Sequence, residues 1–122
     1  MNIYLSGGFY SGWQSQVKQG APSHEYFNPE TDSQQIAICG FVSEDIAGID
    51  WCDLLLAYKQ TSSPYHTGLA AEIGYAYAKG KIIILVDEFD RIDGFLAGMS
   101  KRVYNNLQSA IDYLSGLSNK RG

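Results

Sequence analysis

Cysteine, histidine and proline are scarce in this chain of 122 residues, with two, two and three copies. Cys39 and Cys52 have no CxxC spacing and are too few for a disulfide framework, so we expect reduced, partly buried thiols. His24 and His66 stand apart in the sequence, and no cluster of metal ligands is expected around them. These shortages argue against a disulfide-stapled secreted domain and against a metal centre.

Long hydrophobic runs are missing as well. The longest strongly apolar run, IIILV at 82–86, is far shorter than the ~20 residues that a membrane span needs. The opening residues, MNIYLSGGF, lack the basic region and the long apolar region of a signal peptide. We therefore expect a cytoplasmic protein with no membrane partner.

Positive charge is also limited. Nine lysines and arginines face thirteen acidic residues, which gives a net charge of -4. Adjacent basic residues occur only at 101–102 and 120–121, so the sequence has no basic stripe of the kind that binds a phosphate backbone. A nucleic-acid polymer is not an expected partner, whereas a small metabolite remains open.

The chain does contain enough apolar residues for one core, since 45% of it is hydrophobic. We expect a single domain over 1–122 with strands at 2–6, 24–29, 53–59, 81–88 and 102–104. Helices are expected around 13–20, 43–51 and 67–79, and around a final apolar pattern of Leu107, Ile111 and Leu114. Segment 30–35 reads as a loop, and 87–98 as a solvated loop or a lid. Strands that are continuously apolar and alternate with helices predict a doubly wound α/β fold, with a parallel sheet of about five strands covered on both faces.

The ends of the predicted helices carry capping signals. Ser43 and Thr67 are expected to cap the second and third helices, and Gly80 is expected to end the third. Ligands of open parallel sheets bind beyond the carboxyl ends of the strands. In this chain those ends lead into 6–13, 28–35, 59–66 and 87–99.

Glu72 is an unusual residue for its helix. Its neighbours three and four positions away are Gly68, Leu69, Tyr75 and Ala76, and none of them is charged. Burying a carboxylate is costly unless it is paired, and that cost is tolerated most often at functional sites. Glu72 is therefore either a working acid facing the crevice or a buried structural carboxyl held by a tyrosine or an amide.

Other candidate residues have ordinary interpretations when taken alone. The loop GGFYSG (7–12) follows a strand and is either a tight turn or a substrate-lining loop. It matches neither G-x-G-x-x-G nor a P-loop. An acid such as Asp45 in the first turn of a helix complements the helix dipole, and Tyr4 suits a strand.

Three stretches taken together resemble the nucleoside 2-deoxyribosyltransferase family, including its relatives that hydrolyse 2′-deoxynucleoside 5′-monophosphates. They are IYLSGGF (3–9), DIAGIDWCDLLLA (45–57) and GLAAEIGYAYAKGK (68–81). The resemblance implies a Rossmann- or flavodoxin-like fold with Glu72 as the nucleophile, Asp45 as an active-site acid and Tyr4 against the nucleophile. The scheme requires no metal and no organic cofactor.

The resemblance and the loop positions also imply a set of substrate-binding residues. They are Gly7, Gly8, Phe9, Trp13, Asn28, His66 and Gly68, with Tyr10 as a further residue that could stack on a base. His66 stands where transferases of the family commonly carry an aspartate that holds the 5′-hydroxyl of the sugar, and a histidine there could instead bind a 5′-phosphate. Family members are homodimers or larger, with Asn105 or Asn106 available to complete a neighbouring site.

Three functions remain open from the sequence. The first is transfer of deoxyribose from one nucleobase to another, and the second is hydrolysis of a deoxynucleoside or its 5′-monophosphate to free base. The third is a non-catalytic nucleotide-binding or sensor protein on the same fold. Tyr4, Asp45 and Glu72 together favour catalysis, because a binding protein has no need of an unpaired acid on an apolar face.

Overall fold

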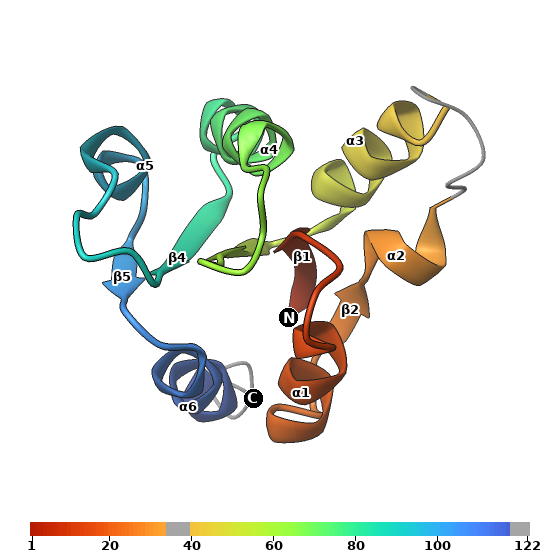
Figure 1. The fold of residues 1–122 in the computed structure, drawn as a ribbon. Helices are drawn as coiled ribbons and strands as arrows, with labels where there is room; N and C mark the ends of the chain where they lie inside the picture. The colour runs from red at the N-terminus through yellow and green to blue at the C-terminus, as the bar shows by residue number, and fades with distance from the viewer. Residues whose placement is uncertain (34–39, 118–122) are drawn as a thin grey trace.

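The computed structural model describes residues 1–33 and 40–117, in which strands and helices alternate (Figure 1). The strands in these ranges are β1 (Asn2–Gly7), β2 (Glu25–Phe27), β3 (Leu54–Lys59), β4 (Ile82–Asp87) and β5 (Arg102–Tyr104). The helices are α1 (Trp13–Gly20), α2 (Pro29–Asp32), α3 (Val42–Trp51), α4 (Thr67–Ala78), α5 (Gly94–Gly98) and α6 (Leu107–Leu117). Each of the expected strands is present, and no end differs from the expected one by more than two residues.

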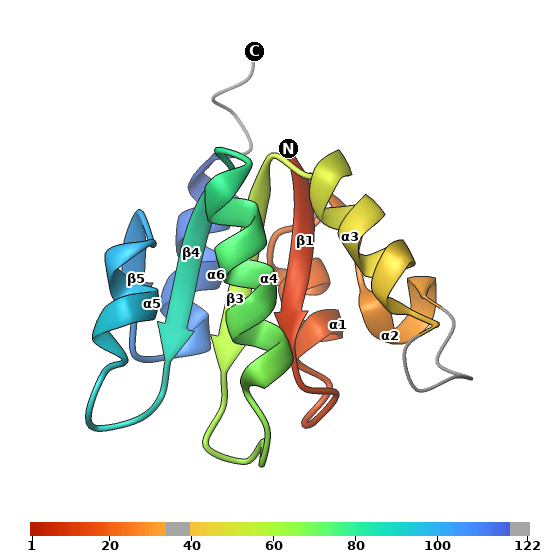
Figure 2. The same cartoon turned by 90° about the horizontal axis from the view of Figure 1, so that it is seen from above.

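The strands form one parallel sheet in the order β2-β1-β3-β4-β5. All of its strands point to the same edge, where the loops that follow them gather (Figure 2). In this flavodoxin-like order, the chain moves outward in opposite directions from β1 and β3, and ligands bind at that switch point. The predicted doubly wound α/β class is confirmed.

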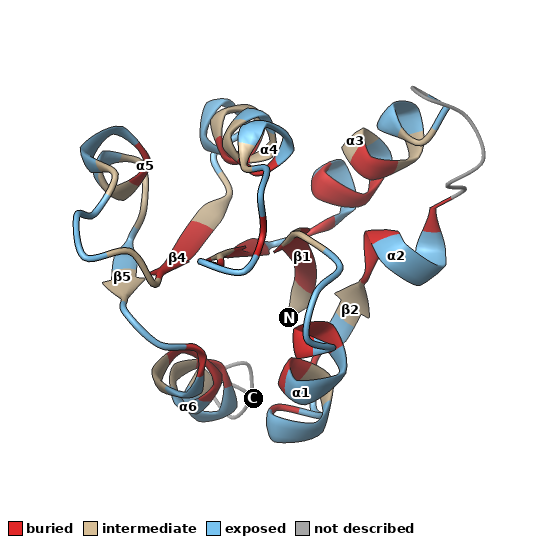
Figure 3. Cartoon of the chain, in the orientation of Figure 1, coloured by how far each residue is buried: buried red, intermediate tan, exposed pale blue. Residues whose placement is uncertain are grey.

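Alternation along the strands sends side chains to two separate cores. Figure 3 shows buried residues on the sheet and on the helices of both faces. In β1, Ile3 and Leu5 belong to the core under α1 and α6, whereas Tyr4 belongs to the core under α3, α4 and α5. All three side chains are almost fully buried, and each burial of this size stabilises the fold by about 1.5–3 kcal/mol. The second core carries the face on which the candidate acid of α4 lies.

Helix α4 ends as expected but begins differently. Its N-cap is His66, which makes no side-chain capping bond, and Thr67 is the first helical residue. The expected capping role of Thr67 is therefore wrong. Gly80 adopts a φ of 75°, and the amides of Gly80 and Lys81 donate to carbonyls of the last turn, which is a Schellman ending. The expected glycine stop is confirmed.

Two short helices were expected to be loops. In α2, the Asn28 side chain accepts a bond from the amide of Glu30, and Pro29 begins the helix. In α5, the Asp93 side chain accepts bonds from two amides of the first turn. Such helices of one turn follow from local capping rather than from apolar periodicity.

Three further expectations concern individual residues. Ser43 does not cap α3, because Phe41 occupies the N-cap position without a side-chain bond. Cys52 is a buried free thiol, as expected, while Cys39 and the pair at 120–121 lie outside the described residues. Among the helices in the described ranges, none is long and apolar enough to cross a membrane.

Candidate active site

A cleft of about 230 Å³ opens at the carboxyl edge of the sheet. Its lining comes from the β1–α1 loop, α2, the start of α3, the loop before α4 and α4 itself. The lining residues are Gly7, Gly8, Phe9, Pro29, Phe41, Asp45, Tyr65, Gly68, Leu69 and Glu72. A smaller hollow of about 150 Å³ shares four of these residues, Phe41, Asp45, Gly68 and Glu72. The cleft therefore lies at the switch point between β1 and β3 that the topology marks for a ligand.

Two hydroxyl groups hold the carboxylate of Glu72. Tyr4 Oη donates to Oε2 at 2.6 Å, and Ser6 Oγ donates to Oε1 at 2.6 Å. Tyr4 and Ser6 are fully buried and stand two positions apart on β1, so both face α4. Each carboxylate oxygen thus has one fixed partner and one lone pair directed elsewhere.

The pKa of Glu72 reflects opposing effects. Burial raises it to about 7, the hydrogen bonds from Ser6 and Tyr4 lower it, and the charge of Asp45 raises it. Burial, together with the adjacent Glu72 charge, raises the pKa of Tyr4 well above its ordinary value. Tyr4 therefore remains a donor while Glu72 titrates near neutral pH.

Asp45 is the second carboxyl group of the cleft, and it is buried. The hydroxyl of Ser33 donates to its Oδ1. Burial raises the pKa of Asp45, the Ser33 bond lowers it, and neighbouring Glu44 raises it. Two carboxyl groups with raised pKa values thus share one cleft, which is typical of sites that transfer protons.

Glycines let the β1–α1 loop pass close to the sheet. Gly7 has a φ of 153°, and a Cβ there would lie 2.8 Å from the carbonyl oxygen of Tyr58. A Cβ at Gly8 would lie 2.8 Å from Ser63 Oγ. Both glycines and the half-exposed Phe9 line the cleft, as the sequence predicts.

Trp13 and Asn28 do not line the cleft. Trp13 is fully buried in the core under α1, and its Nε1 donates to the Gly8 carbonyl at 2.8 Å. The expected stacking of Trp13 on a ligand is wrong, because its ring faces the opposite side of the sheet. Asn28 is buried and caps α2, so it positions Pro29, which does line the cleft.

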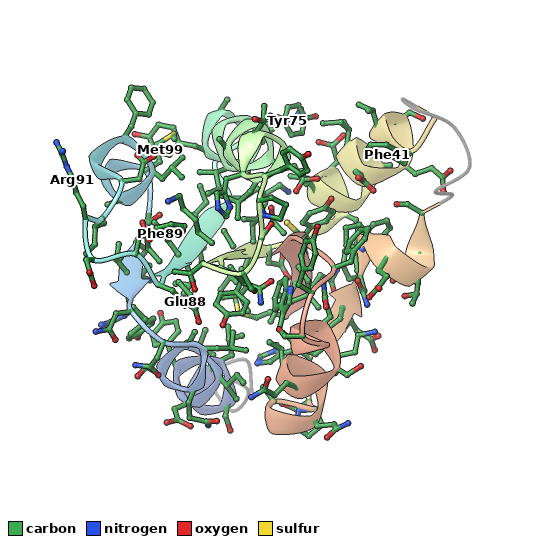
Figure 4. The ribbon with its side chains drawn as sticks, viewed as in Figure 1. Phe41, Tyr75, Glu88, Phe89, Arg91 and Met99 are labelled. Atoms are coloured by element: carbon green, nitrogen blue, oxygen red, sulfur yellow. The ribbon has the colours of Figure 1, made fainter. Side chains whose placement is uncertain are left out.

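His66 lies beside the cleft, between the lining residues Tyr65 and Gly68. Its ring packs edge-on against the ring of Phe89, with 5.5 Å between the two ring centres. Lys59 Nζ lies 3.9 Å from the centre of the Phe89 ring. Burial and the Lys59 charge lower the pKa of His66. Figure 4 shows Phe89 on the loop that follows β4, at the carboxyl edge. A lysine and a titratable histidine thus stand near the first turn of α4.

Sequence reasoning missed several residues of the site. Ser6 and Ser33 hold the two carboxyl groups, and Phe41, Tyr65 and Pro29 form walls of the cleft. Alternation along β1 could have singled out Ser6, because a polar residue two positions after Tyr4 shares its face. The wall residues lie on loops and helix starts and carry no comparable signal.

A larger hollow of about 610 Å³ lies at the opposite, amino edge of the sheet. It is lined by the starts of β1 and β4 and the end of α4, and it includes Cys52 and Asp53. Burial raises the pKa of Cys52 to about 11, so the thiol stays protonated and unreactive. The predicted acids Glu72 and Asp45 belong to the other edge, which we take as the candidate active site.

A sequence model described as nucleoside 2-deoxyribosyltransferase matches residues 3–107. The chain belongs to the nucleoside 2-deoxyribosyltransferase family. The match spans every element that builds the cleft, from β1 through the start of α6. Membership makes the protein an enzyme of the deoxyribosyltransferase kind.

Solved structures of the same fold include members with named activities. The 2-deoxyribosyltransferase of Bacillus psychrosaccharolyticus has a TM-score of 0.76 at 20% identity, over 93% of this chain and 92% of that one. The CMP N-glycosidase BcmB of Clostridium botulinum has a TM-score of 0.64 at 23% identity, over 93% and 98%. A conserved protein from Enterococcus faecalis V583 has a TM-score of 0.75 at 17% identity, over 95% and 98%. Comparison with curated proteins gives no match.

Proposed function

We propose that this deoxyribosyltransferase-family protein cleaves the N-glycosidic bond of a 2′-deoxynucleoside or of its 5′-monophosphate, with Glu72 as the nucleophile, and transfers the sugar to another nucleobase. The observation that carries the proposal is the carboxylate of Glu72, which lines the cleft while Tyr4 and Ser6 donate to its two oxygens. Hydroxyl donors fix the orientation of a nucleophile without neutralising it.

The chemistry follows from the charge of the transition state. As the C1′–N bond breaks, the sugar gains oxocarbenium character, which a nearby carboxylate stabilises. Glu72 then forms a C1′–O ester bond, and the electron pair of the broken bond leaves with the base. In the second step a ring nitrogen of an acceptor base attacks C1′ and gives its proton to the Asp45 carboxylate. The ester breaks, and Glu72 regains its carboxylate with net retention at C1′.

Asp45 is the candidate proton donor to the departing base. Its buried carboxyl lines the same cleft, and its raised pKa favours retention of a proton. Phe9, Phe41 and Tyr65 surround the opening and provide aromatic surfaces on which a base can stack.

Hydrolysis to the free base is the second candidate. The observation that favours it is the place of His66 beside the cleft, between the lining residues Tyr65 and Gly68. A ring N–H of His66 would donate to a 5′-phosphate, and water would then replace the acceptor base. Lys59 is already paired with the buried carboxylate of Asp87. Under this alternative Glu72 is still the nucleophile, but the substrate is a 5′-monophosphate and the acceptor is water.

The experiment is chromatography of the purified protein with a panel of deoxynucleosides and their 5′-monophosphates, each with and without a second free base. Release or exchange of base by the wild type, and its loss in Glu72→Ala, is the expected result. Dependence on the acceptor base identifies a transferase, and its absence identifies a hydrolase. Ligand binding without turnover by the wild type would contradict catalysis and leave a nucleotide-binding protein.

The variant His66→Asn tests, in the same assay, whether His66 binds the 5′-phosphate of the substrate. If the histidine binds phosphate, the variant raises KM for the monophosphate and leaves KM for the nucleoside unchanged. An equal change for both substrates would contradict a phosphate role.

A further inference from the structure

Ser6 is the second hydroxyl group on Glu72, and no motif in the sequence marks it. We propose that Ser6 is a positioning residue that holds the Glu72 carboxylate in one plane and keeps it ionised; this role rests on the glycosidic function proposed above. Ser6 is fully buried beneath the cleft rather than part of its lining, so it acts through Glu72 alone.

The geometry supports a role in orientation. Tyr4 binds Oε2 and Ser6 binds Oε1, each at 2.6 Å, so rotation of the carboxylate breaks at least one short bond. Both donors come from β1, which is hydrogen-bonded to strands on either side, and Ser6 pairs with Ala57 of β3. A central strand is a more rigid platform than a loop, so the plane of the nucleophile is fixed before substrate arrives.

The surroundings of Glu72 explain why the hydroxyls matter for its charge. Burial of Glu72 and the charge of Asp45, which lies near it on α3, act against ionisation, whereas Tyr4 on β1 donates a hydrogen bond to the carboxylate. Within the described part of the chain, no cation contributes to the shift of Glu72. Hydrogen bonds from Ser6 and Tyr4 are the effects that favour the carboxylate. Loss of the Ser6 bond therefore moves Glu72 toward its protonated, non-nucleophilic form.

Because Ser6 is buried, water cannot easily replace the hydrogen bond that its hydroxyl donates to Glu72. Ser6 is fully buried, so the hydroxyl cannot be replaced by bulk water when it is removed. Ser6→Ala deletes the donor and leaves the strand backbone unchanged. Ser6→Cys retains a weaker donor of similar shape.

The test is a titration of the Glu72 carboxyl carbon by NMR in the ligand-free full chain. Ser6→Ala is expected to raise the pKa of Glu72 by about one pH unit, and Ser6→Cys by less. Ser100→Ala is the matched control, because Ser100 Oγ donates to the Leu96 carbonyl at 2.8 Å, away from the cleft, and its loss is expected to leave Glu72 unchanged. An unaltered Glu72 titration in Ser6→Ala would overturn the proposal.

Activity provides a second readout that separates this inference from the proposed function. In the profile of kcat/KM against pH, the limb that reflects ionisation of Glu72 is expected to move to higher pH in Ser6→Ala, in parallel with the NMR titration. In Ser6→Cys the limb is expected to move less. A fall in activity with no movement of that limb would overturn the role of Ser6. Absence of turnover in the wild type would instead contradict the proposed function. If Ser6→Ala fails to fold, the Ser6→Cys titration decides, and no shift there would count against the proposal.

Discussion

At the scale of single residues, Glu72 has the environment with the largest consequence. Burial raises its pKa from the ordinary 4.5 to about 7, so the folded protein binds this proton more tightly than the unfolded chain does. The stability that Glu72 contributes is therefore present below about pH 4.5 and is lost as the pH rises toward 7. Above pH 7 the charged carboxylate is held at a cost to folding.

Glu72→Gln is expected to stabilise the fold at alkaline pH while it removes activity. At pH 8 the free energy of unfolding should rise by about 1–3 kcal/mol relative to the wild type, because the amide carries no charge to bury. At pH 5 the gain should be much smaller, since the wild-type carboxyl is mostly protonated there. Urea denaturation at both pH values measures the difference, and an equal effect at pH 5 and pH 8 would contradict the raised pKa.

Asp45→Asn tests proton donation at the same scale. With a natural nucleoside, cleavage should slow by about 10²–10⁴-fold, as expected for loss of a general acid. With an aryl deoxyriboside whose leaving group needs no proton, the loss should be much smaller. Rates with both substrates are compared with Asp112→Asn, whose exposed side chain accepts a bond from Gln108 on α6. Equal losses with the two substrates would argue that Asp45 has another role.

At the scale of elements, the long strands and helices were predictable and the one-turn helices were not. Strands β3 and β4 follow from continuous apolar runs, since both faces of the sheet are covered. Helices α2 and α5 contain too few residues for a periodic pattern and depend on the caps Asn28 and Asp93. Sequence alone does not distinguish such caps from the polar residues of a loop.

In the candidate site too, residues marked by their local sequence were predictable and residues defined by long-range contacts were not. Glu72 could be singled out because a helix places it among apolar neighbours, whatever the rest of the chain does. The contacts of Ser6 and Ser33 join residues that are 66 and 12 positions apart in the sequence, and they require the packed structure. Trp13 was misplaced because its position after the β1–α1 loop does not reveal which face of the sheet its ring covers.

Gly48→Ala tests how closely α3, the helix that carries Asp45, packs against β2. A Cβ at Gly48 would lie 2.8 Å from the ring of Phe27, which itself stacks on Tyr4 at 5.4 Å. The substitution should push α3 away from β2 and lower the free energy of unfolding by about 1–3 kcal/mol. Gly74→Ala in α4, where a Cβ meets nothing within 4 Å, should instead stabilise the fold by about 0.4–1 kcal/mol. Urea denaturation of both variants checks these two predictions. An unchanged free energy of unfolding in Gly48→Ala would contradict the close contact between Gly48 and Phe27.

At the scale of the whole molecule, the cleft is small for the ligand proposed. Its volume of about 230 Å³ is below the roughly 300–1,000 Å³ of typical small-molecule sites. Apolar side chains are exposed on the α3 and α4 side, among them Val42, Trp51 and Tyr77. Both features agree with the expectation, which stays a prediction, that a second chain covers part of the site.

Sedimentation of the purified protein checks that expectation. We expect a particle of at least two chains, each of 13.5 kDa, because burial of the exposed apolar side chains stabilises association. Turnover should then fall with dilution below the dissociation constant. A monomer that keeps full activity at every concentration would contradict a shared site.

The proposed mechanism requires that Glu72 becomes covalently bonded to the sugar, and peptide mass spectrometry detects that bond. The protein is mixed with a substrate identified in the panel, quenched in acid during turnover and digested. We expect a mass increase of one deoxyribosyl group, or of its 5′-phosphate, on the peptide that contains Glu72, and no increase in Glu72→Gln. Turnover with no adduct on that peptide, or with the adduct on another residue, would contradict the mechanism.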